Sequence, residues 1–202
     1  MDSNQVIVRD ADGEFGGLSN RSLAFPVCVN DARLPTAEHL FHVLKFRHPL
    51  IQRALVNLRE PASCKTFAIS RDLRSGVRED WDDVKLEVMD FCVRTKLLTN
   101  WVQFGKLLRA TAGKEILMVS GSDNYWGMVK NKDGQFDGEN QLGLLLMKLR
   151  DEFLSGGNVG TRVVAPPRDI DLLFLGKKIE VKDRRAQIAQ LEARLAENLL
   201  AA

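Results

Sequence analysis

The chain has 202 residues, of which 45% are hydrophobic and 28% charged, a composition that excludes a disordered protein and is typical of a domain with a sizeable core. A formal net charge of +2 is too small to give general affinity for nucleic acids or membranes, so contact with phosphate requires a local group of basic residues. No apolar run approaches the roughly 20 residues of a membrane helix, and the first residues lack the pattern of a signal peptide. We therefore expect a cytoplasmic protein with no membrane partner.

The first third of the chain predicts a strand, a hairpin and two helices. Residues 6–8 alternate with polar neighbours as a short strand does, and residues 25–35 resemble a hairpin that turns at Asn30 and Asp31. A helix is expected to begin after Thr36, its N-cap, and a second helix to run over residues 50–58 and to stop before Pro61.

The middle of the chain predicts a long helix followed by two strands. Residues 82–112 carry apolar side chains at helical spacing after a cap at Asp82, with an interruption near Thr99 and Asn100. Strands are expected at residues 115–119 and 125–129, before a helix that begins near Asn140. Together these elements predict an α+β fold that is compact and mainly helical.

The character of the sequence changes after Gly157. Residues 161–167 resemble an extended linker, residues 171–181 a hairpin around Gly176, and residues 182–200 an amphipathic helix. The apolar side chains of that helix fall in line at Ile188, Leu191, Leu195 and Leu199. The stretch is too short for an independent coiled coil, so packing against the body is favoured, with a homodimer through this helix left open. We divide the chain into a catalytic domain, residues 1–157, and a linker with a helical extension, residues 158–202.

Several familiar sites are excluded by motif. The chain has no phosphate-binding loop ending in Gly-Lys-Ser/Thr and no dinucleotide fingerprint. His39 and His42 are three residues apart with Glu38 before them, which is not the spacing of a helical zinc site. The three cysteines form no Cys-x-x-Cys pair and lie in apolar surroundings, which indicates reduced, inert thiols. Neither a metal nor a cofactor is expected.

Carboxylate chemistry fits the remaining residues. Glu38 lies in the first turn of a helix, and Asp123 lies on a loop beside Trp126. Two carboxyl groups beside an aromatic ring can activate water or stabilise a cationic sugar. The residues alone equally support a plain helix-terminus glutamate and a turn aspartate that bonds its own backbone.

Five motifs occur in order over roughly residues 15–154. They are Phe-Gly-Gly-Leu-Ser-Asn from Phe15, Leu-Pro-Thr-Ala-Glu-His-Leu-Phe from Leu34, Arg-Glu-Asp-Trp from Arg78 with Met89 and Lys96 after it, Asp-Asn-Tyr-Trp-Gly from Asp123, and Asn-Gln-Leu-Gly from Asn140. In this order they resemble the motifs of the NADAR family of YbiA-like N-glycosidases. The resemblance implies a compact, mainly helical α+β domain that hydrolyses the N-glycosidic bond between a phosphorylated ribose and a base.

The resemblance implies catalytic roles for Glu38, Asp123 and Lys45. For Lys45 it leaves open whether the amine holds phosphate or forms a Schiff base with the sugar. The implied substrate-binding residues are Asn20, Arg78, Trp81, Lys96, Trp126, Gly127, Asn140 and Gly143.

Three functions follow from the resemblance. The first, favoured here, removes ADP-ribose from guanine in DNA or RNA, because the basic residues between Arg53 and Arg78 suit a nucleic acid. The second cleaves ribosylamino-pyrimidine phosphate intermediates of riboflavin synthesis, which fits the near-neutral overall charge. The third is a module that binds ADP-ribose or a nucleotide without cleaving it.

Overall fold

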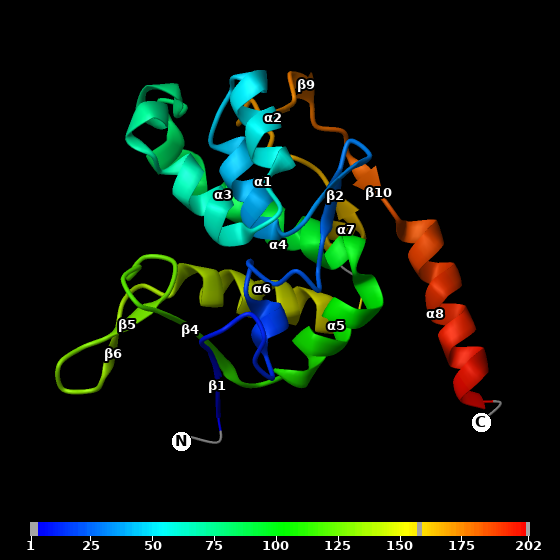
Figure 1. Ribbon diagram of the computed structural model, residues 1–202. Coiled ribbons are helices and arrows are strands. Elements are labelled where there is room, and N and C mark those ends of the chain that lie inside the picture. The colour runs from blue at the N-terminus through cyan, green and yellow to red at the C-terminus, as the bar shows by residue number, and fades with distance from the viewer. Residues whose placement is uncertain (1–3, 157–158, 201–202) are drawn as a thin grey trace.

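The computed structural model describes residues 4–156 and 159–200 and combines α-helices with short strands (Figure 1). The α-helices are α1 (Ala37–Leu44), α2 (Pro49–Asn57), α3 (Pro61–Ala68), α4 (Trp81–Thr99), α5 (Trp101–Ala110), α6 (Gln141–Leu154), α7 (Val159–Arg162) and α8 (Arg185–Leu200). The 3₁₀ helices are η1 (Gly16–Leu18) and η2 (Arg71–Gly76). The strands are β1 (Gln5–Val8), β2 (Val27–Val29), β3 (Ala32–Leu34), β4 (Glu115–Ser120), β5 (Met128–Lys130), β6 (Phe136–Asp137), β7 (Val163–Val164), β8 (Leu173–Phe174), β9 (Lys177–Lys178) and β10 (Lys182–Asp183). This mixture confirms the predicted α+β, mainly helical fold class. Across the described residues, no helix has the length and apolar character needed to cross a membrane.

A small sheet with the strand order β1-β4-β5-β6 forms one side of the molecule (Figure 1). β1 and β4 are parallel, with Val6 opposite Ile116, and β5 is parallel to β4. The side chains of Val6 and Ile116 are both buried, and α6 packs along β4. The predicted strand over residues 125–129 is only partly correct, because β5 begins at Met128. Tyr125 and Trp126 belong instead to a turn, in which their backbone N–H groups donate to the Asp123 carboxylate.

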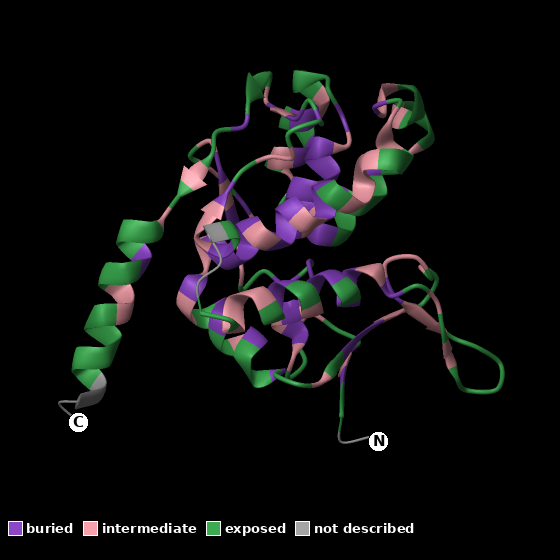
Figure 2. Cartoon of the chain, turned by 180° about the vertical axis from the view of Figure 1, so that it is seen from behind, coloured by how far each residue is buried: buried purple, intermediate pink, exposed green. Residues whose placement is uncertain are grey.

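The long helix at the centre of the molecule is interrupted where the sequence predicts. α4 ends and α5 begins on either side of Asn100, whose Nδ2 donates to the carbonyls of Lys96 at 2.9 Å and Pro26 at 2.8 Å. α4 packs against α1, α6 and β2, and Figure 2 shows the buried residues gathered on these central helices. The predicted cap at Asp82 is wrong, because α4 begins at Trp81 and the cap position is Asp80, two residues earlier.

The helices before α4 follow local rules. Thr36 caps α1 as predicted, and its Oγ1 accepts the N–H of His39 at 3.2 Å. The β2–β3 hairpin turns at Asn30 and Asp31, whose φ angles of 45° and 61° suit these residue types. The sequence predicted only that the second helix stops before Pro61. In the structure Pro61 also begins α3, where a residue without an N–H loses no hydrogen bond.

The segment after residue 158 returns to the body of the protein. β7 pairs antiparallel with β10, and β8 pairs with β9 across Leu175 and Gly176, which confirms the predicted hairpin. Gln52 of α2 holds this hairpin: its Nε2 donates to the carbonyl of Leu173 at 2.7 Å, and its Oε1 accepts the N–H of Leu175 at 2.6 Å.

This segment also contributes to the hydrophobic core. Its buried side chains lie in the same cluster as those of α1 and α4, namely Val164, Ile170, Leu172, Phe174, Ile179 and Ile188. The prediction of an extended linker over residues 161–167 is only partly correct, because its first two residues end α7 and Val164 of β7 is buried in the core. The predicted boundary residue, Gly157, lies outside the described residues.

The helix α8 packs against the body only along its first half. Ile188 is fully buried and Leu191 contacts the core, which confirms the predicted packing. Leu195 is 41% exposed, and the end of α8 stands away from the other helices (Figure 1). The side chain of Leu199 lies outside the described part of the chain. A homodimer through this helix stays a prediction.

Candidate active site

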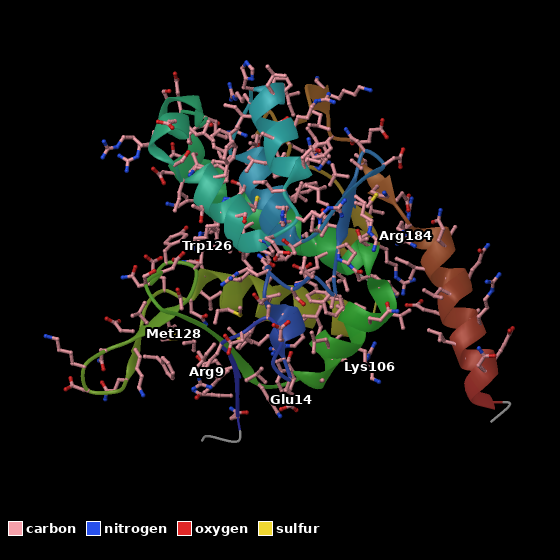
Figure 3. All side chains as sticks on the ribbon, viewed as in Figure 1. Arg9, Glu14, Lys106, Trp126, Met128 and Arg184 are labelled. Atoms are coloured by element: carbon pink, nitrogen blue, oxygen red, sulfur yellow. The ribbon has the colours of Figure 1, made fainter. Side chains whose placement is uncertain are left out.

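A cleft of about 360 Å³ lies between the start of α1, the loop after η1 and the loop after β4. Figure 3 shows Trp126 between the α1 to α3 helices and the sheet. Five of the residues predicted to form the site line this cleft: Asn20, Glu38, Asp123, Trp126 and Gly127. These residues come from three distant parts of the sequence, so the fold assembles the core of the predicted site.

Local hydrogen bonds position Glu38. The Thr36 cap fixes the first turn of α1, and the N–H of Glu38 donates to the carbonyl of Asn20 at 3.0 Å. One turn later, His42 places its Nε2 3.5 Å from the Glu38 carboxylate, and both side chains are largely buried. The start of α1 and the loop that carries Asn20 are therefore joined at the wall of the cleft.

The surroundings of Glu38 keep its carboxyl group ionised. Burial alone would raise the pKa of Glu38, but the hydrogen bond and charge of His42, together with Lys65 and Arg21, lower it below its ordinary value. An ionised carboxylate at neutral pH can accept a proton or stabilise a cation, but it cannot protonate a leaving group. The structure thus favours a base over an acid at this position.

Asp123 shapes the turn that presents Trp126. Its Oδ1 accepts the backbone N–H groups of Tyr125 at 3.2 Å and Trp126 at 3.0 Å, and its own N–H donates to Ser120 Oγ at 2.9 Å. The turn role considered for Asp123 is therefore present. Asp123 also lines the cleft, and the described residues provide no hydrogen bond to Oδ2, so this oxygen can act on a ligand.

Trp126 forms an aromatic wall that the neighbouring rings support. Phe41 meets it edge-on with the ring centres 5.4 Å apart, and Tyr125 does so at 4.9 Å. The next residue, Gly127, lies so close to β4 that a Cβ atom would be 2.4 Å from the carbonyl oxygen of Met118. A larger residue at Gly127 would push this wall away from the sheet.

Asn20 offers a hydrogen-bond acceptor at the cleft. Its side chain is 2% exposed, and its Nδ2 lies 2.9 Å from Met89 Sδ. Within the described chain, its Oδ1 is buried and has no hydrogen-bond partner. Because an unpaired buried oxygen is costly, a donor on a bound ligand is the natural partner.

Three other predicted residues line a neighbouring pocket of about 660 Å³: Lys45, Arg78 and Trp81. This pocket shares Asp123 and Trp126 with the cleft. The Lys45 amine is 5.9 Å from the centre of the Trp81 ring, and burial lowers its pKa against the opposing charge of Asp82.

Arg78 is only partly available to a ligand in that pocket. Its Nε and Nη2 donate to Asp80 at 2.6 and 2.8 Å. This bidentate pair fixes the buried guanidinium in place, so its charge is largely balanced within the protein.

Asn140 and Gly143 join α6 to the sheet and line neither the cleft nor the neighbouring pocket. The buried Asn140 side chain accepts the N–H of Met118 at 3.0 Å and donates to the carbonyl of Ile116 at 2.8 Å. A Cβ atom on Gly143 would be 2.3 Å from that same carbonyl oxygen. The structure thus places both residues at a packing contact between helix and strand.

Lys96 is also separated from the cleft. Its side chain is fully buried in α4, and its amine donates to the carbonyls of Gly17 at 2.6 Å and Ser19 at 2.8 Å. The lysine therefore contacts the back of the loop whose next residue is Asn20.

The cleft contains charged residues that sequence reasoning did not assign to it: Arg9, Asp10, Asp12, Arg21 and Lys65. Arg21 directly follows Asn20 of the first motif, and Lys65 belongs to the basic region noted in the sequence, so both had a usable signal. The sequence of the loop after β1, which contributes Arg9, Asp10 and Asp12, gave no such signal. Across the described residues, the structure holds no group of three or more His, Cys, Asp or Glu side chains arranged to hold a metal ion.

Comparisons with known proteins show which family the chain resembles in sequence and fold. The model of the NADAR domain matches residues 8–154. The N-glycosidase YbiA of Escherichia coli is 33% identical over 140 residues, which cover 69% of this chain and 82% of YbiA. The NMR structure of E. coli YbiA superimposes with a TM-score of 0.65 at 27% identity, over 77% of this chain and 88% of that chain.

Two larger proteins share the same region. The riboflavin biosynthesis protein VVA0006 of Vibrio vulnificus is 34% identical over 126 residues, which cover 62% of this chain and 32% of that protein. The chloroplastic riboflavin biosynthesis protein PYRR of Zea mays is 31% identical over 154 residues, which cover 72% of this chain and 24% of that protein. The chain thus spans a third or less of these two relatives.

Proposed function

Because the chain belongs to the NADAR family, we propose that it hydrolyses the N-glycosidic bond between a phosphorylated ribose and a nitrogen base. The observation that carries this proposal is the buried, ionised Glu38 in a cleft that it shares with Asp123 and Trp126. The name of the E. coli relative, an N-glycosidase, supports the same reaction.

The proposed reaction uses the two carboxylates in different roles. As the bond from the sugar C1 to nitrogen breaks, its electron pair leaves with the base, whose nitrogen takes up a proton from solvent, and positive charge grows on C1, where Asp123 stabilises it. A water molecule attacks C1 and passes its proton to Glu38, whose lowered pKa keeps it ionised and able to accept a proton at neutral pH. The Trp126 ring supports a flat face of the sugar or base.

The phosphate of the substrate is assigned to the basic rim of the cleft. Arg21 and Lys65 both line it and are exposed, so they can contact an anion without a desolvation cost. Both also lower the pKa of Glu38. A bound phosphate would offset part of their effect on the carboxylate.

For the substrate, the first candidate is guanine that carries ADP-ribose in DNA or RNA. The neighbouring pocket supports it, because a chain longer than one ribose phosphate can pass Trp126 and reach Lys45 and Trp81. In this proposal Lys45 holds the second phosphate or attacks C1, and Trp81 stacks on a base.

The second candidate is a ribosylamino-pyrimidine phosphate of riboflavin synthesis, for which the cleft alone is large enough. The printed names of the Vibrio and maize relatives support it. A purely binding module is disfavoured, because the ionised Glu38 repels phosphate without contributing to affinity.

The test is to incubate the purified protein with each candidate substrate and to follow the released base and sugar phosphate by mass spectrometry, with Glu38→Gln as the control. Release from the ADP-ribosylated oligonucleotide, weakened by added salt, supports the first candidate. Release only from the pyrimidine supports the second. Binding of either substrate without any release would contradict the hydrolase.

A further inference from the structure

Lys96 is a buried cation without a buried anion. Its side chain has no exposed surface, and among the described residues no carboxylate forms an ion pair with it. Around its amine lie the carbonyls of Gly17 and Ser19 and the rings of Phe104 and Phe25, whose centres are 4.6 and 5.4 Å away. Burial lowers its pKa to about 7, and no neighbouring charge offsets this effect. An apolar residue of similar size would avoid this cost, so the amine has a role beyond filling space.

The bonds of Lys96 act on one loop. The two carbonyls belong to Gly17, which lies in η1, and to Ser19, its C-cap, and Gly17 packs closely against Phe25 and Leu107. A Cβ atom on Gly17 would be 2.4 Å from the Phe25 ring, so the loop fits closely between its neighbours. With the amine in place, the backbone has little freedom to shift.

That loop forms the wall of the cleft. Ser19, Asn20 and Arg21 line the cleft directly after the carbonyls that Lys96 binds. The carbonyl of Asn20 accepts the N–H of Glu38 at 3.0 Å, so the loop is also tied to the start of α1. The hydrogen bond from Lys96 to Ser19 and the hydrogen bond from Glu38 to Asn20 thus lie on adjacent residues of the loop backbone.

We propose that Lys96 is a positioning residue that never touches the substrate. Instead it holds the loop from Gly17 to Arg21, so that Asn20 and Glu38 face the substrate correctly. This inference rests on the proposed hydrolase function for its effect on turnover, but not for its effect on the loop. It replaces the substrate-binding role that the sequence suggested for Lys96.

The test compares Lys96→Met with Leu98→Ala. Methionine keeps most of the volume of lysine but donates no hydrogen bond. Leu98 is also buried in α4, but it lines a small cavity on the side of the β2–β3 hairpin, so its replacement destabilises the protein without touching the loop. Amide hydrogen exchange and steady-state kinetics are measured for both variants below their unfolding temperatures. If Lys96→Met does not fold, Lys96→Gln takes its place: its side chain is one atom shorter, so its two donor hydrogens fall short of the Gly17 and Ser19 carbonyls, and the same changes are expected.

In Lys96→Met we expect amide exchange over residues 17–21 to become faster. We also expect kcat to fall by about a hundredfold, because reacting groups that are slightly misplaced cause losses of that size, with a smaller change in KM. Leu98→Ala is expected to lower thermal stability and to keep its loop exchange and kcat. Unchanged exchange over residues 17–21 in Lys96→Met would overturn the inference, as would a loss of kcat equal to that of Leu98→Ala. Should the parent protein cleave none of the substrates, the proposed function fails, and the exchange measurement still decides the role of Lys96.

Discussion

Replacement of Asn140 separates a role in folding from a role in substrate binding. The side chain makes two buried hydrogen bonds, to the N–H of Met118 and the carbonyl of Ile116, on either side of one β4 residue. Removing it leaves both backbone groups buried without that partner, at about 1–3 kcal/mol each, so Asn140→Gly should lower the free energy of unfolding by roughly 2–6 kcal/mol. Asn140 also has a φ of 52°, a left-handed conformation that costs alanine about 1–2 kcal/mol and glycine nothing.

The free energy of unfolding of Asn140→Gly and Asn140→Ala is measured by urea unfolding followed by circular dichroism. KM is measured under conditions in which each variant is folded. We expect Asn140→Ala to be less stable than Asn140→Gly by ~1 kcal/mol, and KM to change little in either. A KM increase of about tenfold with unchanged stability would refute this reasoning and return Asn140 to the substrate site.

Three further predictions concern Lys96, His42 and Gly127. The lowered pKa of Lys96 means that the unfolded chain binds more protons above pH 7, so the parent protein should gain stability relative to Lys96→Met between pH 7 and 8.5, by up to ~1.4 kcal/mol per pH unit in urea unfolding. Because His42 lowers the pKa of Glu38, His42→Phe should raise that pKa and move the acid limb of the pH–rate profile to higher pH, whereas His42→Gln, which keeps a donor, should move it less. Gly127→Ala should lower the melting temperature, since its Cβ would meet the Met118 carbonyl oxygen at 2.4 Å, and an unchanged melting temperature would contradict the close contact seen here.

Local features of the fold could be predicted from the sequence because neighbouring residues determine them. The Thr36 cap, the turn at Asn30 and Asp31, and the interruption at Asn100 each depend on residues within a few positions. The start of α3 at Pro61 was missed, because proline is compatible with both the end of one helix and the first turn of the next.

The site was harder to predict, because a motif does not distinguish a residue that binds the substrate from one that supports the fold. Glu38 and Trp126 line the cleft, whereas Asn140 and Lys96, drawn from equally specific motifs, bind backbone groups behind it. Burial decides between these roles, and burial depends on contacts between residues far apart in the sequence. The division of the site into two pockets that share Asp123 likewise exists only in three dimensions.

The sequence also did not predict that the strand and hairpin after residue 163 contribute to the hydrophobic core, because that burial too depends on residues far apart in the sequence. Val164 and Phe174 lie in short apolar stretches that resemble a linker and an isolated hairpin. The hairpin that carries Phe174 is held by Gln52 of α2, more than a hundred positions away in the sequence, and β7, which carries Val164, packs against α4.

The central claim is that Glu38 acts as a base on water within a cleft that binds a ribosyl base, and the most direct measurement compares binding with turnover in Glu38→Gln. The amide keeps the shape of the side chain and removes its ability to take a proton. With the substrate that the parent protein cleaves, we predict a Kd close to that of the parent in calorimetry and a turnover lowered by about 10²–10⁴-fold. A variant that binds weakly but turns over at the parental rate when saturated would contradict this account and show that Glu38 only holds the substrate.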